Sequence, residues 1–258
     1  MTGSDLPNFS VDLGGEVAMV TGASAGLGRR FATVLAAAGA RVAALGRRGD
    51  RLEDLAAEID RAGGVCLPLA VDVTDDGAVV AAFDRTEAAL GPLTILVNNA
   101  ATPDAQYATR MSAELIDRVL DTNLRAPYVL SCELARRLIR RRAGGRIVNL
   151  SSMGAFYYTG NGAALYSITK AAVNRMTEAL AVEWAPFHIN VNAIAPGAFA
   201  SEMMAGMIER QGDLSAAYPR RRVGDPAQLD STLLYLVSSS SEFVTGTIVK
   251  VDDGQRPR

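Results

Sequence analysis

The sequence predicts an α/β fold in which a parallel sheet carries helices on both faces. Short apolar runs of strand length recur along the 258 residues, and stretches with apolar residues at helical spacing separate them. Strands that alternate with helices pair in parallel through right-handed crossovers. With 49% hydrophobic residues, the chain can form a core on each face of the sheet, covered by helices. No Pro-rich or Gly/Ser-rich linker divides the chain, so we expect one domain over residues 1–258.

The strand predictions rest on runs rich in Val, Ile, Leu and Ala. A long helix is expected over about residues 164–184. Its apolar residues cover more than one face, so it packs either inside one subunit or between subunits. Strands are expected at residues 16–21, 41–45, 65–70, 94–98, 146–150, 190–195 and 247–251.

A glycine-rich turn, TGASAGLG at 21–28, joins the first strand to the first helix. Free N–H groups and the dipole at a helix N-terminus favour an anion, so this arrangement suits a pyrophosphate. Gly22 permits a tight turn. Gly26 and Gly28 permit close approach of backbone to phosphate and of helix to sheet. The turn therefore predicts a dinucleotide site.

The second strand ends at Gly46, and Arg47 and Arg48 follow it. Folds that bind NAD usually carry an acid here for the ribose hydroxyls, whereas an arginine suits a 2′-phosphate. No carboxylate appears before Asp50, and the Arg47 guanidinium can hold a phosphate through two parallel hydrogen bonds. The sequence favours NADP(H), with NAD(H) as the alternative cofactor. The other interpretation is that two arginines merely solvate a strand end.

Tyr166 and Lys170 are four residues apart in a predicted helix and therefore share a face. The charge of Lys170 favours the phenolate, so we expect the Tyr166 pKa to lie below its ordinary value near ~10. Before this pair, the strand 146–150 ends on Ser151 and Ser152. A serine at such a strand end can donate to a carbonyl oxygen, and one of the two is expected only to cap a turn. Taken alone, the pair could equally be a surface Tyr beside a Lys.

Together these residues resemble the short-chain dehydrogenase/reductase family over about residues 15–254. The resemblance implies a single Rossmann-type doubly wound domain and a seven-stranded parallel sheet in the order 3-2-1-4-5-6-7. It implies catalytic roles for Asn123, Ser152, Tyr166 and Lys170, with Asn123 holding a water that relays protons to Lys170. The implied cofactor-binding residues are Gly22, Ser24, Gly26, Leu27, Gly28, Arg47, Arg48, Asp72, Val73, Asn99, Ala100, Ala101, Tyr166, Lys170, Pro196, Gly197, Phe199 and Ser201.

The chain departs from the family pattern at a few positions. Ala101 replaces a Gly, which places a Cβ beside backbone expected near the nicotinamide ribose. Phe199 stands where Ile or Val is common, and Ser201 keeps the hydroxyl of the usual Thr.

The family places a mobile substrate lid near residues 199–220. The methionine-rich run 201–208 suits such a lid, because methionine adapts to varied apolar shapes, and a core face is the alternative. With the aromatic run 156–158, it suggests a substrate that has apolar surface beside its carbonyl.

The implied reaction interconverts a carbonyl and a secondary alcohol by hydride transfer, with Tyr166 as proton donor or acceptor. The resemblance points to 3-oxoacyl reductases and to sugar or alicyclic alcohol dehydrogenases. A non-catalytic nucleotide-sensing protein on the same fold is the alternative, and the four intact catalytic residues argue against it. The family implies a small-molecule substrate and a homotetramer, or else a homodimer.

Composition argues against other classes of function. A net charge of −2 disfavours nucleic acid as a partner, and the arginines within 136–142 are interpreted as complementing a helix end. Cys66 and Cys132 are interpreted as core residues, and the single histidine, His188, as structural. No metal-ligand spacing is present. No signal peptide and no run of ~18 apolar residues appears, so we expect a cytoplasmic protein without a membrane segment.

Overall fold

The computed structural model describes residues 11–104, 106–158, 160 and 162–255. Residues 1–10, 105, 159, 161 and 256–258 of the predicted domain lie outside the described residues. Seven parallel strands form one sheet in the order β3-β2-β1-β4-β5-β6-β7, which confirms the predicted order. The strands are β1 (Val17–Thr21), β2 (Arg41–Gly46), β3 (Val65–Ala70), β4 (Ile95–Asn98), β5 (Gly145–Leu150), β6 (Ile189–Pro196) and β7 (Ile248–Val251).

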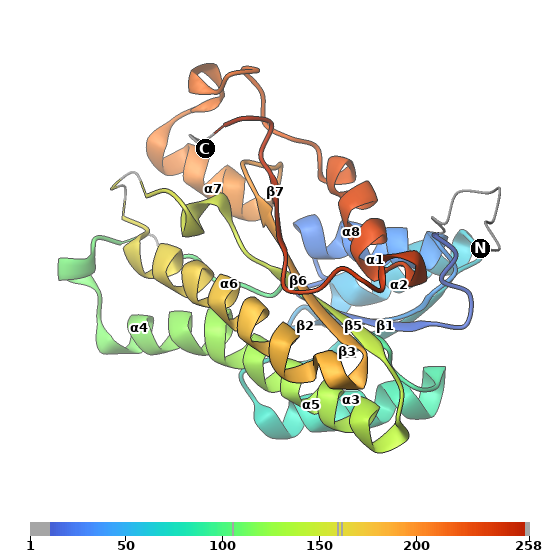
Figure 1. Cartoon of the computed structure of the whole chain (residues 1–258). Coiled ribbons are helices and arrows are strands. Elements are labelled where there is room, and N and C mark those ends of the chain that lie inside the picture. Colours follow the sequence, from blue (N-terminus) through green and yellow to red (C-terminus); the bar gives the residue numbers. More distant parts are fainter. Residues whose placement is uncertain (1–10, 105, 159, 161, 256–258) are drawn as a thin grey trace, which may run out of the picture.

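Helices cover both faces of the sheet because its strands are apolar on both sides (Figure 1). In β1, Val17 and Met19 face one core, and Ala18 and Val20 face the other. The first core contains residues of α3, α5 and α6, and the second contains residues of α1, α2 and α8. The helices are α1 (Gly26–Ala37), α2 (Gly49–Arg61), α3 (Asp76–Leu90), α4 (Ala113–Leu120), α5 (Ala126–Arg141), α6 (Ala164–Trp184), α7 (Glu202–Gln211) and α8 (Asp230–Val237).

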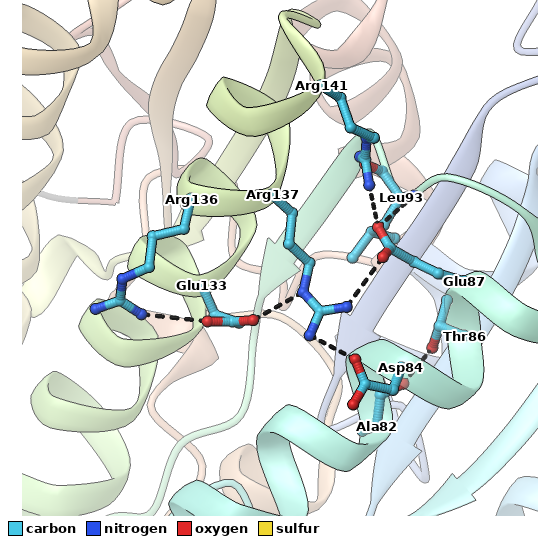
Figure 2. A network of polar contacts seen from close by, with 9 residues as sticks. All are labelled: Ala82, Asp84, Thr86, Glu87, Leu93, Glu133, Arg136, Arg137 and Arg141. Atoms are coloured by element: carbon cyan, nitrogen blue, oxygen red, sulfur yellow. Dashed lines mark hydrogen bonds and ion pairs between the residues drawn. The ribbon is translucent and has the colours of Figure 1, made fainter.

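Two arginines near the end of α5, Arg137 and Arg141, join α5 to α3 (Figure 2). Arg137 is only 7% exposed. Its guanidinium donates to Glu133 at 2.7 Å, to Asp84 at 2.7 Å and to Glu87 at 2.9 Å. Arg141 also binds Glu87. Buried charges need partners of this kind, so the network fixes the relative position of two neighbouring helices.

Within the described part of the chain, none of the helices combines the length and the apolar character needed to cross a bilayer. No group of three or more His, Cys, Asp or Glu residues is arranged to hold a metal ion among these same residues.

Candidate active site

The predicted site residues gather at the carboxyl ends of the strands, which all point to one edge in a parallel sheet. Residues 22–28 follow β1, residues 46–48 end or follow β2, and residues 72–73 follow β3. Residues 99–101 follow β4, Ser152 follows β5, and residues 196–201 end or follow β6. Tyr166 and Lys170 reach the same edge from the first turns of α6.

The glycine turn after β1 packs against the end of β4. Gly22 and Gly26 have φ angles of 68° and 54°, which favour glycine. Asn99 Nδ2 donates to the carbonyl oxygens of Thr21 at 2.9 Å and of Gly22 at 3.3 Å. A Cβ on Gly28 would lie 2.3 Å from the Gly22 oxygen, so a side chain there would force the turn and α1 apart.

This turn has the properties of a pyrophosphate cradle. Helix α1 begins at Gly26, and Ala25 before it provides no side-chain cap for the first N–H groups. Those donors and the helix dipole are available to an anion. Leu27, inside the turn, packs on the second core and anchors the start of α1. Ala100, after β4, donates its N–H to Thr21 Oγ1 at 3.0 Å and so holds the end of β4 against the turn. The residues present therefore fit a dinucleotide, and the turn's backbone with Asn99 and Ala100 would hold it.

The end of β2 lies beside the same turn. Arg48 donates from Nε and Nη2 to Ser24 Oγ at 3.2 and 3.1 Å. A Cβ on Gly46 would lie 3.5 Å from that Oγ atom, so a side chain at position 46 would face this contact. The structure thus places Arg48 next to the glycine turn, whereas Arg47 is exposed.

Asp72 and Val73, at the end of β3, border this region. The Asp72 carboxylate accepts from the Thr74 N–H at 3.0 Å and the Thr74 hydroxyl at 2.8 Å. These bonds, the backbone one first, lower its pKa, and the charge of Arg47 adds a smaller effect in the same direction. Val73 is buried in the first core. Asp72 is therefore an ionised acceptor held in place by Thr74.

Ser152, Tyr166 and Lys170 come together where β5 meets α6. The Ser152 hydroxyl accepts the Gly154 N–H at 3.0 Å and lies near the Tyr166 ring. Lys170 Nζ lies 5.6 Å from the centroid of the Tyr166 ring and donates to the Leu150 carbonyl at 2.6 Å. Ser151 turns inward and donates to the Lys170 carbonyl at 3.3 Å. Of the two serines, Ser152 is thus the one beside the phenol.

The expectation that Lys170 lowers the Tyr166 pKa is wrong for this structure. Burial raises the pKa of Tyr166, the nearby Ser152 hydroxyl lowers it by less, and the charge of Asp104 raises it further. Burial also lowers the pKa of Lys170 to about 8. The prediction assumed a solvated helix face, whereas Lys170 is 3% exposed and Tyr166 is only partly exposed. Desolvation then disfavours the charged form of each group.

Asn123 lies in a single π-helical turn, Asp121–Arg125, between α4 and α5. Its Oδ1 accepts from the Thr102 N–H at 2.8 Å, and its Nδ2 donates to the Thr102 carbonyl at 2.9 Å. Nδ2 also reaches Thr169 Oγ1 at 3.4 Å. Asn123 therefore ties the loop after β4, which carries Ala101, to α6.

The segment after β6 closes the other side of the site. Gly197 donates its N–H to the Val251 carbonyl at 2.9 Å, and Phe199 is 8% exposed. Ser201 caps α7 by accepting from the Met204 N–H at 3.1 Å. A Cβ on Gly26 would meet Ser201 Cβ at 3.4 Å. The start of α7 therefore lies on the glycine turn.

Two acidic residues at this site were missed by the sequence reasoning. Asp104 is 4% exposed and accepts the Tyr166 N–H at 3.0 Å, which caps the first turn of α6. A capping residue normally lies next to its helix, so an acid so distant in the sequence gave no signal. The second is Glu202 at the start of α7, which binds Arg48 and Arg51.

Comparisons with known proteins agree with this geometry. The model of the short chain dehydrogenase family matches residues 16–212. A 3-oxoacyl-[acyl-carrier-protein] reductase of Aquifex aeolicus is 34% identical over 95% of this chain and 99% of its own length. A galactitol 2-dehydrogenase of Cereibacter sphaeroides is 36% identical over 94% and 95%.

A solved structure of a short-chain dehydrogenase/reductase from Mycobacterium marinum superimposes with a TM-score of 0.92. It is 34% identical, and the match covers 96% of this chain and 98% of that chain. Similar solved chains were determined with NADPH in one case and NADH in another. The family match over most of the sequence, the relatives and the fold agree. The chain belongs to the short-chain dehydrogenase/reductase family and is an oxidoreductase of that family.

Proposed function

We propose that this protein catalyses reversible hydride transfer between a nicotinamide cofactor and a carbonyl or secondary alcohol. The observation that carries the proposal is the grouping of Ser152, Tyr166 and Lys170: the Ser152 side chain lies near the Tyr166 ring, and Lys170 Nζ lies 5.6 Å from the centroid of that ring. This group lies at the same sheet edge as the glycine turn, so a cofactor held there would meet a substrate oxygen bound at the phenol. A sensor protein has no use for this arrangement.

In the reductive direction, Tyr166 donates its proton to the substrate oxygen while Ser152 donates a hydrogen bond to the same atom. Both donors stabilise the negative charge that develops on that oxygen. The cofactor, when bound, supplies the hydride. Because burial raises the Tyr166 pKa, the phenol keeps its proton at neutral pH, which is the form needed for carbonyl reduction.

Lys170 and Asn123 act behind the phenol in this proposal. The Lys170 ammonium returns a proton toward Tyr166 and contacts the cofactor ribose, and its lowered pKa makes proton exchange easier near neutral pH. Asn123 holds the loop at Thr102 and, by the family resemblance, a water that relays protons to Lys170.

We further propose a preference for NADP(H) over NAD(H). This preference is supported by the hydrogen bonds of Arg48 to Ser24, which lie beside Gly46, and by the absence of an acidic residue at the end of β2. A phosphate oxygen could replace the Ser24 acceptor on the same guanidinium edge. We propose a 3-oxoacyl, sugar or alicyclic compound as substrate, with Phe156, Tyr157 and the methionines of α7 lining its pocket. A homotetramer, or a homodimer, and a cytoplasmic location remain predictions.

The proposed reaction is tested by following reduced-nicotinamide absorbance with a panel of ketones from these three classes. Turnover of at least one ketone with the wild type, and its loss in Ser152→Ala, is the expected result. Cofactor binding without turnover of any ketone or of the matching alcohols would favour the sensor instead.

A further inference from the structure

One ion-pair cluster joins the start of α7 to the start of α2. Arg48 Nη1 donates to the Glu202 carboxylate at 2.9 Å (Oε2) and 3.2 Å (Oε1). Arg51 binds the same carboxylate. The other edge of the Arg48 guanidinium holds Ser24. Glu202 therefore occupies two arginines that lie beside the proposed site of the 2′-phosphate.

The local charge favours an anion at this position. Arg48 directly precedes α2, and Arg51 lies in its first turn, where the helix dipole adds positive potential. Hydrogen bonds from Arg51 and then Arg48 lower the Glu202 pKa, so the carboxylate stays charged at neutral pH. The side chains are 41%, 44% and 54% exposed for Arg48, Arg51 and Glu202, so a stronger anion can displace the carboxylate.

Displacement of the Glu202 carboxylate would also release the start of α7, which belongs to the predicted lid. Glu202 is the first residue of α7, and the preceding Ser201 packs over Gly26. A carboxylate and a phosphate that use the same guanidinium groups exclude or repel each other. NADH has no 2′-phosphate and would leave the ion pairs of Glu202 with Arg48 and Arg51 in place. The 2′-phosphate of NADPH would have to replace the Glu202 carboxylate on these two arginines.

We propose that Glu202 is a specificity residue that competes with the 2′-phosphate of NADP(H) for Arg48 and Arg51. This inference rests on the proposed cofactor site. Glu202 weakens the binding of the phosphorylated cofactor relative to NAD(H) and ties the start of α7 to α2 while that phosphate is absent.

The test compares wild type with Glu202→Gln, which removes the charge and keeps the shape. Glu209→Gln is the matched control, because Glu209 is an exposed acid on the same helix. Adenosine 2′,5′-bisphosphate and 5′-AMP are titrated into each purified protein by calorimetry. These probes differ in the 2′-phosphate and lack nicotinamide, so the readout does not depend on turnover. Thermal unfolding of the three proteins establishes that each is folded.

We expect Glu202→Gln to bind the bisphosphate about 3- to 10-fold more tightly than wild type, as the loss of exposed ion pairs permits. Binding of 5′-AMP should change by less than about twofold, and Glu209→Gln should change neither. Unchanged or weaker bisphosphate binding in Glu202→Gln, or an equal gain for both probes, would overturn the inference. Failure of all three proteins to bind either probe would overturn it together with the nucleotide site. The expected shift without turnover of any ketone would overturn only the proposed reaction.

Discussion

At the start of α6, Lys170 is buried and Tyr166 is partly exposed, and burial raises the pKa of Tyr166 while it lowers the pKa of Lys170. The phenol is held in its protonated form, and the Lys170 ammonium becomes a stronger acid than that of an ordinary lysine. At neutral pH the phenol therefore carries the proton that it would donate. Burial, rather than a charge pair on a solvated helix, sets the chemistry of this site.

The lowered Lys170 pKa predicts a pH dependence of stability. Its value is about 8 in the folded protein against 10.5 when exposed. Between these values the unfolded chain binds more protons than the folded one, so the free energy of unfolding rises with pH. Across this pH range the free energy of unfolding should increase by about 3 kcal/mol. Below pH 8 the lysine is charged in both states and its desolvation penalty is fully present.

Urea unfolding of wild type and Lys170→Met at several pH values between 7 and 10.5 measures this effect. Wild type should gain stability relative to the variant as pH rises, because Met does not titrate and every other group is shared. Parallel curves for the two proteins would show that Lys170 is not desolvated as described.

At the scale of elements, Arg137 is the residue that fixes α5 against α3 (Figure 2). Replacing it with Met would leave Glu133 and Glu87 without a buried partner, while their side chains are only 12% and 22% exposed. Removing one partner of a buried ion pair costs about 3–5 kcal/mol when the other charge is left alone. Because Glu87 keeps Arg141 and Glu133 keeps Arg136, Arg137→Met should lower the free energy of unfolding by about 2–3 kcal/mol.

Arg136→Met is the matched control on the same helix. Arg136 is 64% exposed and makes one ion pair with Glu133, so its loss should cost less than about 1 kcal/mol. Denaturant unfolding compares the two variants. Equal losses would mean that the buried network does not hold the helices together.

Elements were easier to predict than the contacts among their side chains. The seven strands lie within one residue of the predicted ends, and α6 spans the predicted 164–184, because apolar runs and spacing encode both. The catalytic pair was found from its i, i+4 spacing and the glycine turn from its flanking strand and helix. The Glu202 and Asp104 contacts were not found, because long-range pairing of charged groups leaves no local pattern.

At the scale of the whole molecule, α5 and α6 both belong to the layer of helices that packs on the first core (Figure 1), and both carry exposed apolar side chains. Ile168 and Val182 of α6 are 62% and 79% exposed, and Tyr128 of α5 is 49% exposed. Exposed apolar groups on neighbouring helices are typical of surfaces that bind another protein. They support the predicted assembly of several copies and favour an outer face of α6 in the interface.

Val182→Glu should therefore shift the protein toward a smaller species, because a charge would be buried without a partner in the interface. Val80→Glu on α3 is the control, since Val80 is 43% exposed on a different helix. Light scattering after size-exclusion chromatography gives the mass of each species. If both variants, or neither of them, form a smaller species, Val182 does not lie in the interface.

The most direct test of the proposed chemistry is the turnover of Tyr166→Phe with a ketone that the wild type reduces. Phe keeps the ring but cannot donate, so kcat should fall by about 10²–10⁴-fold while NADPH affinity stays near that of wild type. Tyr235→Phe, at an exposed tyrosine on α8 away from the site, should keep its activity. A Tyr166→Phe protein that retains more than about a tenth of the wild-type kcat would contradict the role of Tyr166 as the proton donor.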